Sequence, residues 1–143
     1  MKSIICQLGF VVILMTVVVL VQAADKKEMA EKAKQLAEEC VKETGISPDE
    51  TKLIMANESK QIDEKKFTDK MKCYMLCFYK KVGILDANNK HNLTVLTAFM
   101  EARYNTKKDK IKPAITSCGS IKEANHCEHV FKFERCIVTA IEG

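Results

Sequence analysis

KMKCYMLCFYKKV, residues 70–82, is the stretch that decides the fold, because two cysteines lie within a dense run of Met, Leu, Phe and Tyr. Cys73 and Cys77 are four positions apart. Because this spacing is about one helical turn, both cysteines share one face of a helix. The apolar residues around them are too many for one face, and such a helix contacts neighbours on most sides or borders a cavity. The stretch predicts a central helix that begins near Lys65, ends at Gly83 and is anchored by two covalent bonds.

The first residues have the pattern of a secretory signal peptide. A lone Lys2 precedes residues 9–21, which are apolar and uncharged, and small residues at the end of the run favour cleavage after Ala23. The alternative is a retained membrane anchor, because the run approaches the length that spans a bilayer. The cysteine-rich remainder favours export. We therefore expect residues 1–23 to be a signal peptide and residues 24–143 to be one secreted domain without membrane insertion.

Six of the seven cysteines lie in the expected mature domain. An even number of cysteines in an exported chain indicates disulfides rather than free thiols, although spacing alone does not choose the pairing. A metal site is disfavoured, because the chain has no pair of Cys-x-x-Cys motifs and His91, His126 and His129 are not spaced like zinc ligands. We expect three disulfides, no metal and no other cofactor.

Apolar periodicity predicts helices before and after the central one. A capping box at Ser47-Pro48-Asp49-Glu50 starts a short second helix. Pro113 falls within a later helical pattern, so that helix either starts near Lys112 or is kinked at the proline. Apart from the central helix, the expected helices cover residues 26–44, 47–57, 92–104, 106–118 and 125–142. The sequence has no alternating strand pattern, so the fold class is all-α: one compact domain of about six helices.

Charge and motifs exclude several classes of function. The expected mature domain intersperses 22 basic with 19 acidic side chains, which describes a solvated surface. No stacking aromatic residues accompany the basic ones, so a nucleic-acid partner is not expected. The chain also lacks a Gly-x-Ser-x-Gly motif, a His-Glu-x-x-His motif and a His-Asp pair beside adjacent cysteines. We therefore expect no enzymatic activity and no catalytic residue.

The spacing of the cysteines resembles a known pattern. Three residues lie between the second and third mature cysteines, and eight lie between the fifth and sixth. This resembles the insect odorant-binding proteins of the pheromone-binding and general odorant-binding type. The resemblance covers residues 26–142, and Gly83-Ile84-Leu85-Asp86 is similar to the family's usual turn. It implies an apolar cavity framed by the disulfides Cys40–Cys77, Cys73–Cys127 and Cys118–Cys136.

The resemblance also implies which side chains line that cavity, although the same residues could simply form the core. Val130, Phe131 and Ile137 are favoured, because the resembled family commonly uses its last helix as a cavity wall. A hydroxyl of Tyr74, Tyr79 or Tyr104 could orient the polar head of a ligand. The candidate ligand-binding residues are Met71, Tyr74, Met75, Phe78, Tyr79, Leu93, Leu96, Phe99, Ile115, Val130, Phe131 and Ile137.

Two features bear on the release of a ligand. His91 lies in the loop beside the expected pocket, and because histidine titrates near neutrality we expect weaker ligand retention at about pH 5. Seven residues follow Cys136. This tail is long enough to close over an opening of the cavity but too short for an additional helix.

The expected function is that of a secreted carrier. It binds a small hydrophobic or amphipathic molecule, an odorant or pheromone, and carries it through sensillum lymph as a monomer or weak homodimer, with a chemoreceptor as a candidate partner. The nearest alternative is a carrier of a hormone, lipid or host-derived compound in another fluid. A second alternative is a disulfide-stabilised helical protein that acts on membranes or receptors.

Overall fold

The structure is a computed structural model that describes residues 28, 30–55 and 63–143. The chain divides into two compact units, Met1–Gln35 and Leu36–Gly143. In the first unit, the described residues 28 and 30–35 are helical. The expected signal peptide, residues 1–23, lies outside the described residues, as does the predicted end of the second helix near Asn57. The second unit holds the other described residues.

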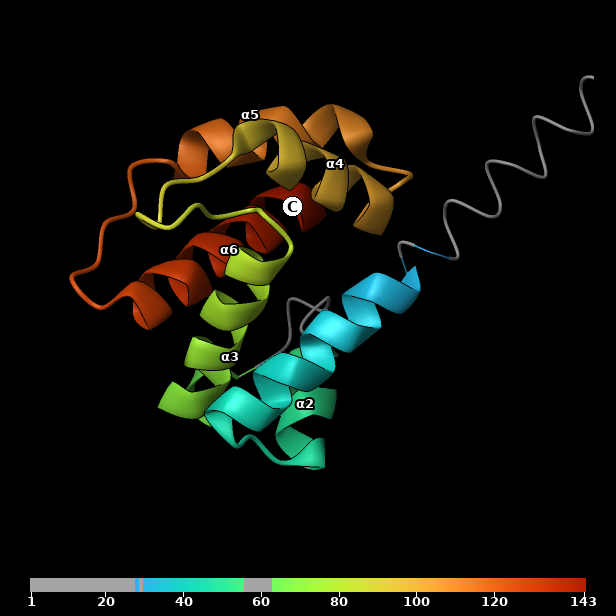
Figure 1. Cartoon of the computed structure of the whole chain (residues 1–143). Coiled ribbons are helices and arrows are strands. Elements are labelled where there is room, and N and C mark those ends of the chain that lie inside the picture. The colour runs from blue at the N-terminus through green and yellow to red at the C-terminus, as the bar shows by residue number, and fades with distance from the viewer. Residues whose placement is uncertain (1–27, 29, 56–62) are drawn as a thin grey trace, which may run out of the picture. The chain divides into compact units, whose positions relative to one another are not determined.

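The described part of the second unit is helical, with an isolated bridge between Leu85 and His91 as the β-type pairing found there. The helical segment that ends at residue 44 precedes five further α-helices and one short 3-10 turn. These elements are α2 (Pro48–Met55), η1 (Glu64–Lys66), α3 (Asp69–Lys81), α4 (Leu93–Arg103), α5 (Lys108–Cys118) and α6 (His126–Glu142) (Figure 1). The prediction of an all-α domain with six helices is confirmed.

The start of α2 is the predicted capping box. The Ser47 hydroxyl oxygen accepts from the Glu50 backbone N–H at 3.2 Å, and the Glu50 carboxylate accepts from the Ser47 N–H at 2.8 Å. The same carboxylate accepts from the Thr68 hydroxyl at 2.8 Å. Because Thr68 is the N-cap of α3, one glutamate ties the beginnings of two helices together.

The central helix α3 begins at Asp69, so the predicted start near Lys65 was wrong by about one turn. The Thr68 hydroxyl accepts from the Met71 N–H at 3.3 Å and caps the helix there. Phe67 has an extended backbone and is buried, with its ring 4.8 Å from that of Phe131. An extended residue at this position interrupts the helix, and the ring contact across to α6 accompanies the break. The end of α3 is as predicted: Gly83 adopts a left-handed φ of +80° just after Lys81.

Helix α5 runs through Pro113 without starting there. It covers Lys108–Cys118 with the proline in its interior, and of the two alternatives a start near Lys112 is wrong. Proline removes one backbone donor and normally destabilises a helix interior. Pro113 is exposed, so water can reach the carbonyl that loses its donor. The opposite side of the helix is buried through Ile111 and Ala114.

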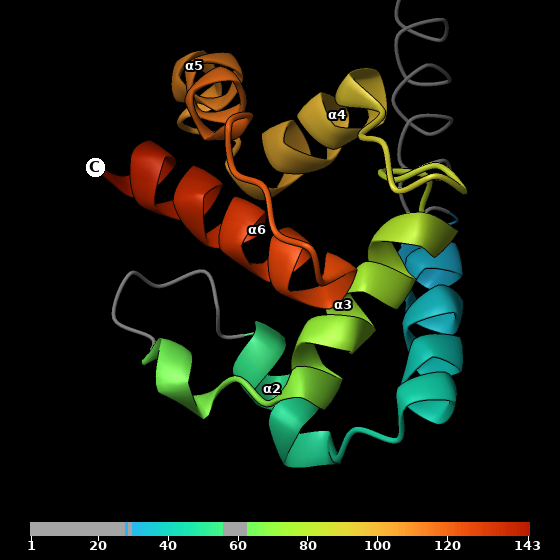
Figure 2. The ribbon, with the colours of Figure 1, turned by 90° about the vertical axis from the view of Figure 1, so that its left-hand side faces the viewer.

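Helix α6 is the element against which the unit is assembled. Contacts join α3 to the first turns of α6 and α5 to its later turns, while α4 packs on α5 and α2 on α3 (Figures 1 and 2). Asn125 caps α6 by accepting from the N–H groups of Cys127 and Glu128 at 2.8 and 3.2 Å. The residues after Cys136 continue α6 as far as Glu142, and Ile137, Val138 and Ile141 are fully buried. The predicted closing tail is therefore a helical part of the core.

Three disulfides fasten this arrangement, with the pairing that the family resemblance implied. They join Cys40 to Cys77, Cys73 to Cys127 and Cys118 to Cys136. Helix α3 is thus bound to the segment before residue 45 and to α6, and α6 is bound to α5. By the chain-entropy relation, the loops closed by these bonds contribute about 3 to 4 kcal/mol each. Such bonds support the helices without requiring every interior position to be filled.

Candidate ligand-binding site

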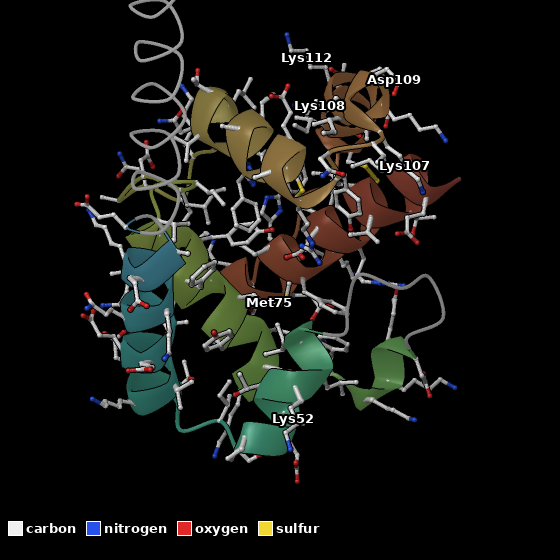
Figure 3. All side chains as sticks on the ribbon, turned by 90° about the vertical axis from the view of Figure 1, so that its right-hand side faces the viewer. Lys52, Met75, Lys107, Lys108, Asp109 and Lys112 are labelled. Carbon is white, nitrogen blue, oxygen red and sulfur yellow. A yellow bond between two sulfur atoms is a disulfide. The ribbon has the colours of Figure 1, made fainter. Side chains whose placement is uncertain are left out.

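The residues predicted from sequence to contact a ligand are mostly brought together in the interior. Nine of the twelve are buried, on α3, α4, α5 and α6, and Figure 3 shows one of them, Met75, in the interior beside α3. Phe78 and Phe99 are half-buried and pack against this core. The structure thus places every member of the set except Leu93 in or against the interior, and the assignment of each side chain to ligand contact stays a prediction.

An aromatic group joins α3 to α4. The Phe99 ring lies 6.4 Å from Phe78 and 6.1 Å from Tyr79, both in edge-on arrangements, and the Tyr74 ring stacks 6.5 Å from Phe78. Edge-on and offset aromatic pairs contribute about 0.5 to 1.5 kcal/mol beyond the burial of their area. Burial raises the pKa of Tyr74, so its phenol stays neutral. These rings form a continuous aromatic contact between the two helices.

A second apolar group lies where α3 crosses the start of α6. Phe131 contacts Phe67, and the Lys72 ammonium lies 5.1 Å from the centre of the Phe131 ring. Lys72 also forms an ion pair with Glu128 at 2.6 Å. This joint is next to the Cys73–Cys127 disulfide, so covalent, ionic and aromatic contacts hold the two helices at one place.

Leu93 differs from the rest of the predicted set. It is 59% exposed, and its side chain lines a shallow, open depression between α4 and α5 with a volume of about 360 Å³. The residues lining it are Leu93, Thr94, Thr97, Ala98, Glu101 and Lys112. Leu93 therefore belongs to the surface of the described unit.

A polar trio crosses the interior between α3, α4 and α6. One oxygen of the Glu134 carboxylate accepts from the Tyr79 hydroxyl at 2.7 Å, and the other accepts from Arg103 Nη1 at 2.7 Å. Glu134 is 5% exposed and Tyr79 is 3% exposed. Burial, reinforced by the Glu134 charge, holds the pKa of Tyr79 well above its usual value. The phenol therefore keeps its proton and donates a hydrogen bond to the carboxylate.

The sequence reasoning missed this trio, although a signal was present. Along α6, Val130, Glu134, Ile137 and Ile141 recur at intervals of three and four residues, so the glutamate lies on the buried stripe. A carboxylate at such a position requires a buried partner. Arg103 supplies it, from a helix that the sequence alone does not place beside α6.

A histidine and phenylalanine cluster holds the loop after α3 against α6. The His91 ring lies 4.2 Å from Phe133 and 5.7 Å from His129. His91 Nε2 is buried and has no hydrogen-bond partner among the described residues. Burial, with a smaller contribution from the neighbouring His129, lowers the pKa of His91. The neutral imidazole is thus the form that this packing favours.

Neither a metal site nor a membrane-spanning helix is found in the part of the chain that the structure describes. No group of three or more His, Cys, Asp or Glu side chains there could hold a metal ion. None of the described helices is long and apolar enough to cross a membrane.

Comparison with known proteins agrees with the cysteine pattern and the helical frame. The chain is 28% identical over 109 residues to general odorant-binding protein 19d of Drosophila melanogaster, covering 73% of this chain and 69% of that protein. General odorant-binding protein 56a of the same species is also 28% identical over 109 residues, covering 76% of this chain and 73% of the relative.

Solved structures share the fold. The fatty acid binding protein OBP56a from the oral disk of the blowfly Phormia regina matches with a TM-score of 0.61 and 28% identity, over 80% of this chain and 93% of that one. The odorant-binding protein dmelOBP28a from Drosophila melanogaster matches with a TM-score of 0.63 and 26% identity, over 81% of this chain and 94% of that one. The PBP/GOBP family pattern matches residues 22–140. The chain therefore belongs to the PBP/GOBP family of insect odorant-binding proteins, which are non-enzymatic carriers of hydrophobic ligands.

Proposed function

We propose that this protein is a secreted carrier that encloses one small hydrophobic or amphipathic molecule, such as an odorant or pheromone, and transports it through an aqueous fluid such as sensillum lymph. The observation that carries the proposal is the group of buried apolar side chains from α3, α4, α5 and α6 within a frame of three disulfides. Burial of an apolar ligand contributes about 25 cal/mol per Å² of surface removed from water. A mainly apolar site with few polar groups gives affinity for a class of molecules.

The polar trio supports a ligand that is apolar over most of its length. Glu134 already satisfies the Tyr79 hydroxyl and pairs with Arg103, so the Tyr79 hydroxyl is engaged within the protein. A similar structure belongs to a blowfly protein named for fatty acid binding, which makes long-chain amphiphiles a second ligand class to test beside volatile odorants. Residues 1–23 would direct export and be removed from the mature protein, and a chemoreceptor remains a candidate partner.

The carrier proposal predicts that the oxidised protein binds a fluorescent apolar probe such as N-phenyl-1-naphthylamine with a Kd of about micromolar order. Volatile esters, terpenoids and fatty acids of increasing length should displace the probe, each to a different extent. Fluorescence titration measures both steps. If none of several probes that differ in size and polarity binds at micromolar concentration, the carrier proposal does not hold.

Substitutions separate ligand contact from core packing. Phe131→Ala and Leu96→Ala remove buried apolar volume within the proposed site, and Ile46→Ala removes it from a buried position outside the candidate set. All three should destabilise the fold by about 2 to 5 kcal/mol. Only the first two should change probe affinity by more than about tenfold under conditions in which each variant remains folded. An equal change for Ile46→Ala would show that affinity follows stability alone.

Acid should weaken ligand retention through His91. Its pKa is lowered in the folded state, so an opened loop binds protons more readily than the packed one. The stability of the packed loop is therefore complete above the ordinary histidine pKa of about 6.5. It is lost as pH falls from there through the lowered pKa. The titratable side chain whose ring lies beside His91 on α6 is His129.

Probe affinity measured from about pH 7.5 to about pH 5 tests this linkage. Affinity should fall in the native protein and remain steadier in His91→Phe, which keeps an aromatic ring against Phe133 without a titrating group. His126→Gln is the matched control, because His126 is exposed in the first turn of α6, and it should behave as the native protein does. Identical pH profiles for the native protein and His91→Phe would contradict the role of His91.

A further inference from the structure

Basic and acidic side chains are interspersed and balanced over most of the chain, and the excess of positive charge lies in one segment. Residues 104–122 contain five lysines and one aspartate, a net charge of +4, which equals the formal net charge of the entire chain. The other residues hold 18 basic and 18 acidic side chains and are neutral as a set. Four of the five lysines, at 107, 108, 110 and 112, lie at the beginning of α5. We call Lys107, Lys108, Lys110 and Lys112 the α5 lysine cluster.

This placement opposes the local stability of the helix. The N-terminal end of an α-helix carries a partial positive charge, which favours acidic and disfavours basic side chains. Helix α5 has Lys107 as its N-cap with no side-chain hydrogen bond to the first turn, and Asp109 is the acid in that turn. By contrast, α4 and α6 begin at capping asparagines. Four lysines at an uncapped helix start are thus not explained by folding.

The cluster also lacks the neutralisation found at other lysines. Lys72, Lys81 and Lys132 each form an ion pair with a glutamate. Among the described residues, no carboxylate forms an ion pair with any lysine of the cluster. Lys108, Lys110 and Lys112 are exposed, and the Lys110 ammonium lies close to Gly143. Figure 3 shows Lys107, Lys108 and Lys112 gathered around the start of α5, with Lys52 on α2 in a different part of the unit.

The cluster is rigidly mounted and is continuous with an exposed apolar side chain. Ile111 and Ile115 bury the inner side of α5, and the Cys118–Cys136 disulfide fixes its end to α6. Lys112 lines the shallow depression between α4 and α5 together with Leu93, which is 59% exposed. Basic residues beside an exposed leucine form the combination that binds the interface of an anionic membrane, where charge attracts and the apolar group inserts.

We propose that the α5 lysine cluster and Leu93 form a docking surface for anionic phospholipid membranes. The basic side chains of the surface are lysines, with no arginine in residues 104–122. Lysine acts as a mobile point charge, whereas recognition of a defined carboxylate or phosphate favours the planar arginine fork. The charge therefore suits a diffuse anionic surface. If the protein is the carrier proposed above, this surface brings it to the bilayers into which its hydrophobic cargo partitions.

Vesicle co-sedimentation tests the proposal. The protein is used with its disulfides oxidised, as the expressing cells export it, and its mass is verified beforehand. Vesicles of phosphatidylcholine containing about one third phosphatidylserine should bind the protein, and pure phosphatidylcholine vesicles should not. Binding should fall steeply between about 0.05 M and about 0.5 M NaCl, because salt screens exposed charges. Equal binding to both kinds of vesicle would overturn the proposal, and so would no binding to either.

A charge-matched pair of variants locates the surface. Replacing Lys107, Lys108 and Lys112 by glutamine should weaken binding about fivefold per lysine and about a hundredfold together. Lys110 is kept because it lies beside Gly143. The control replaces Lys65, Lys66 and Lys70 by glutamine; it removes the same charge from residues 63–70, where acidic residues already balance the lysines. The control should bind within about twofold of the native protein. Equal losses in the two variants would show that only net charge matters.

The absence of tryptophan from the chain provides a reporter for the apolar part. In Leu93→Trp, fluorescence should shift to shorter wavelength when anionic vesicles are added, as the indole enters the membrane interface. In Lys52→Trp, at an exposed position on α2, the emission should not shift. An unshifted Leu93→Trp, or equal shifts in both, would contradict the proposed orientation. The triple lysine variant should keep native affinity for the fluorescent probe. The membrane-docking proposal and the carrier proposal can therefore be contradicted separately.

Discussion

Replacing Glu134 by alanine should destabilise the protein by about 3 to 5 kcal/mol, because it leaves buried groups without their charged partner. The Tyr79 hydroxyl and Arg103 both donate to this carboxylate at 2.7 Å from helices α3 and α4. Tyr79 is 3% exposed, so its phenol cannot recover this contact with water without opening the interior. The loss is large beside a typical total stability of about 5 to 15 kcal/mol. Urea unfolding of the oxidised protein measures it.

Two further variants show whether the loss of stability comes from removing a charge or from leaving buried polar groups without partners. Replacing all three residues with apolar ones (Glu134→Leu, Arg103→Met and Tyr79→Phe) should recover most of the lost stability, because it removes every member of the trio. Glu39→Ala is the surface control. It removes an exposed carboxylate that forms an ion pair with Lys81, and it should leave the urea midpoint almost unchanged. If the triple variant is as unstable as Glu134→Ala, the loss of buried partners is not the cause.

Removing the Cys73–Cys127 disulfide should lower the free energy of unfolding by about 4 kcal/mol by the chain-entropy relation. The bond closes a sequence separation of 54 residues and joins α3 to α6. Without it, the unfolded chain gains conformational freedom, and the joint keeps the Lys72–Glu128 ion pair and the Phe67–Phe131 contact. Replacing both cysteines by serine avoids a reactive unpaired thiol. Urea unfolding with the other two disulfides intact measures the change.

The Cys118–Cys136 bond provides the comparison. Its sequence separation is 18 residues, so its removal should cost about 3 kcal/mol, less than removal of the longer-range bond. The order of the two losses is the test, because chain entropy distinguishes the two bonds only by the length of the loop that each closes. A larger loss for the short loop would indicate that packing of α5 on α6, rather than chain entropy, sets the contribution of each bond.

Local signals in the sequence predicted the boundaries that depend on neighbouring residues. Ser47 and Glu50 formed the expected capping box, and Gly83 ended the central helix. Caps and left-handed glycines require only a few adjacent residues, so they can be recognised without the fold. The start of α3 was missed although Thr68 is a local cap signal there. The burial of Phe67 against Phe131 of α6, which accompanies the break before α3, depends on the tertiary structure. The continuity of α5 through Pro113 likewise could not be predicted, because it depends on the proline lying on the side of the helix that faces solvent.

The candidate site divides in the same way. Periodicity identified the buried face of α3 and of α6, so most of the predicted ligand-contacting residues lie in the interior. Leu93 fitted the pattern of α4 but lies at the surface, because it is the first residue of that helix. The Arg103–Glu134 pair and the His91–Phe133 contact were not predicted, since each joins elements distant in sequence.

The sequence by itself determined the helical class, the six paired cysteines and the family, because periodicity and cysteine spacing are properties of the linear chain. The excess of lysine over acidic residues in residues 104–122 is also a property of the sequence. Only the tertiary structure decided that Glu134 is buried with Arg103 and Tyr79, that His91 packs on α6, and that the α5 lysine cluster shares a surface with Leu93. The physical reason is that burial and ion pairing depend on which helices become neighbours, and long-range packing rather than local periodicity sets that arrangement.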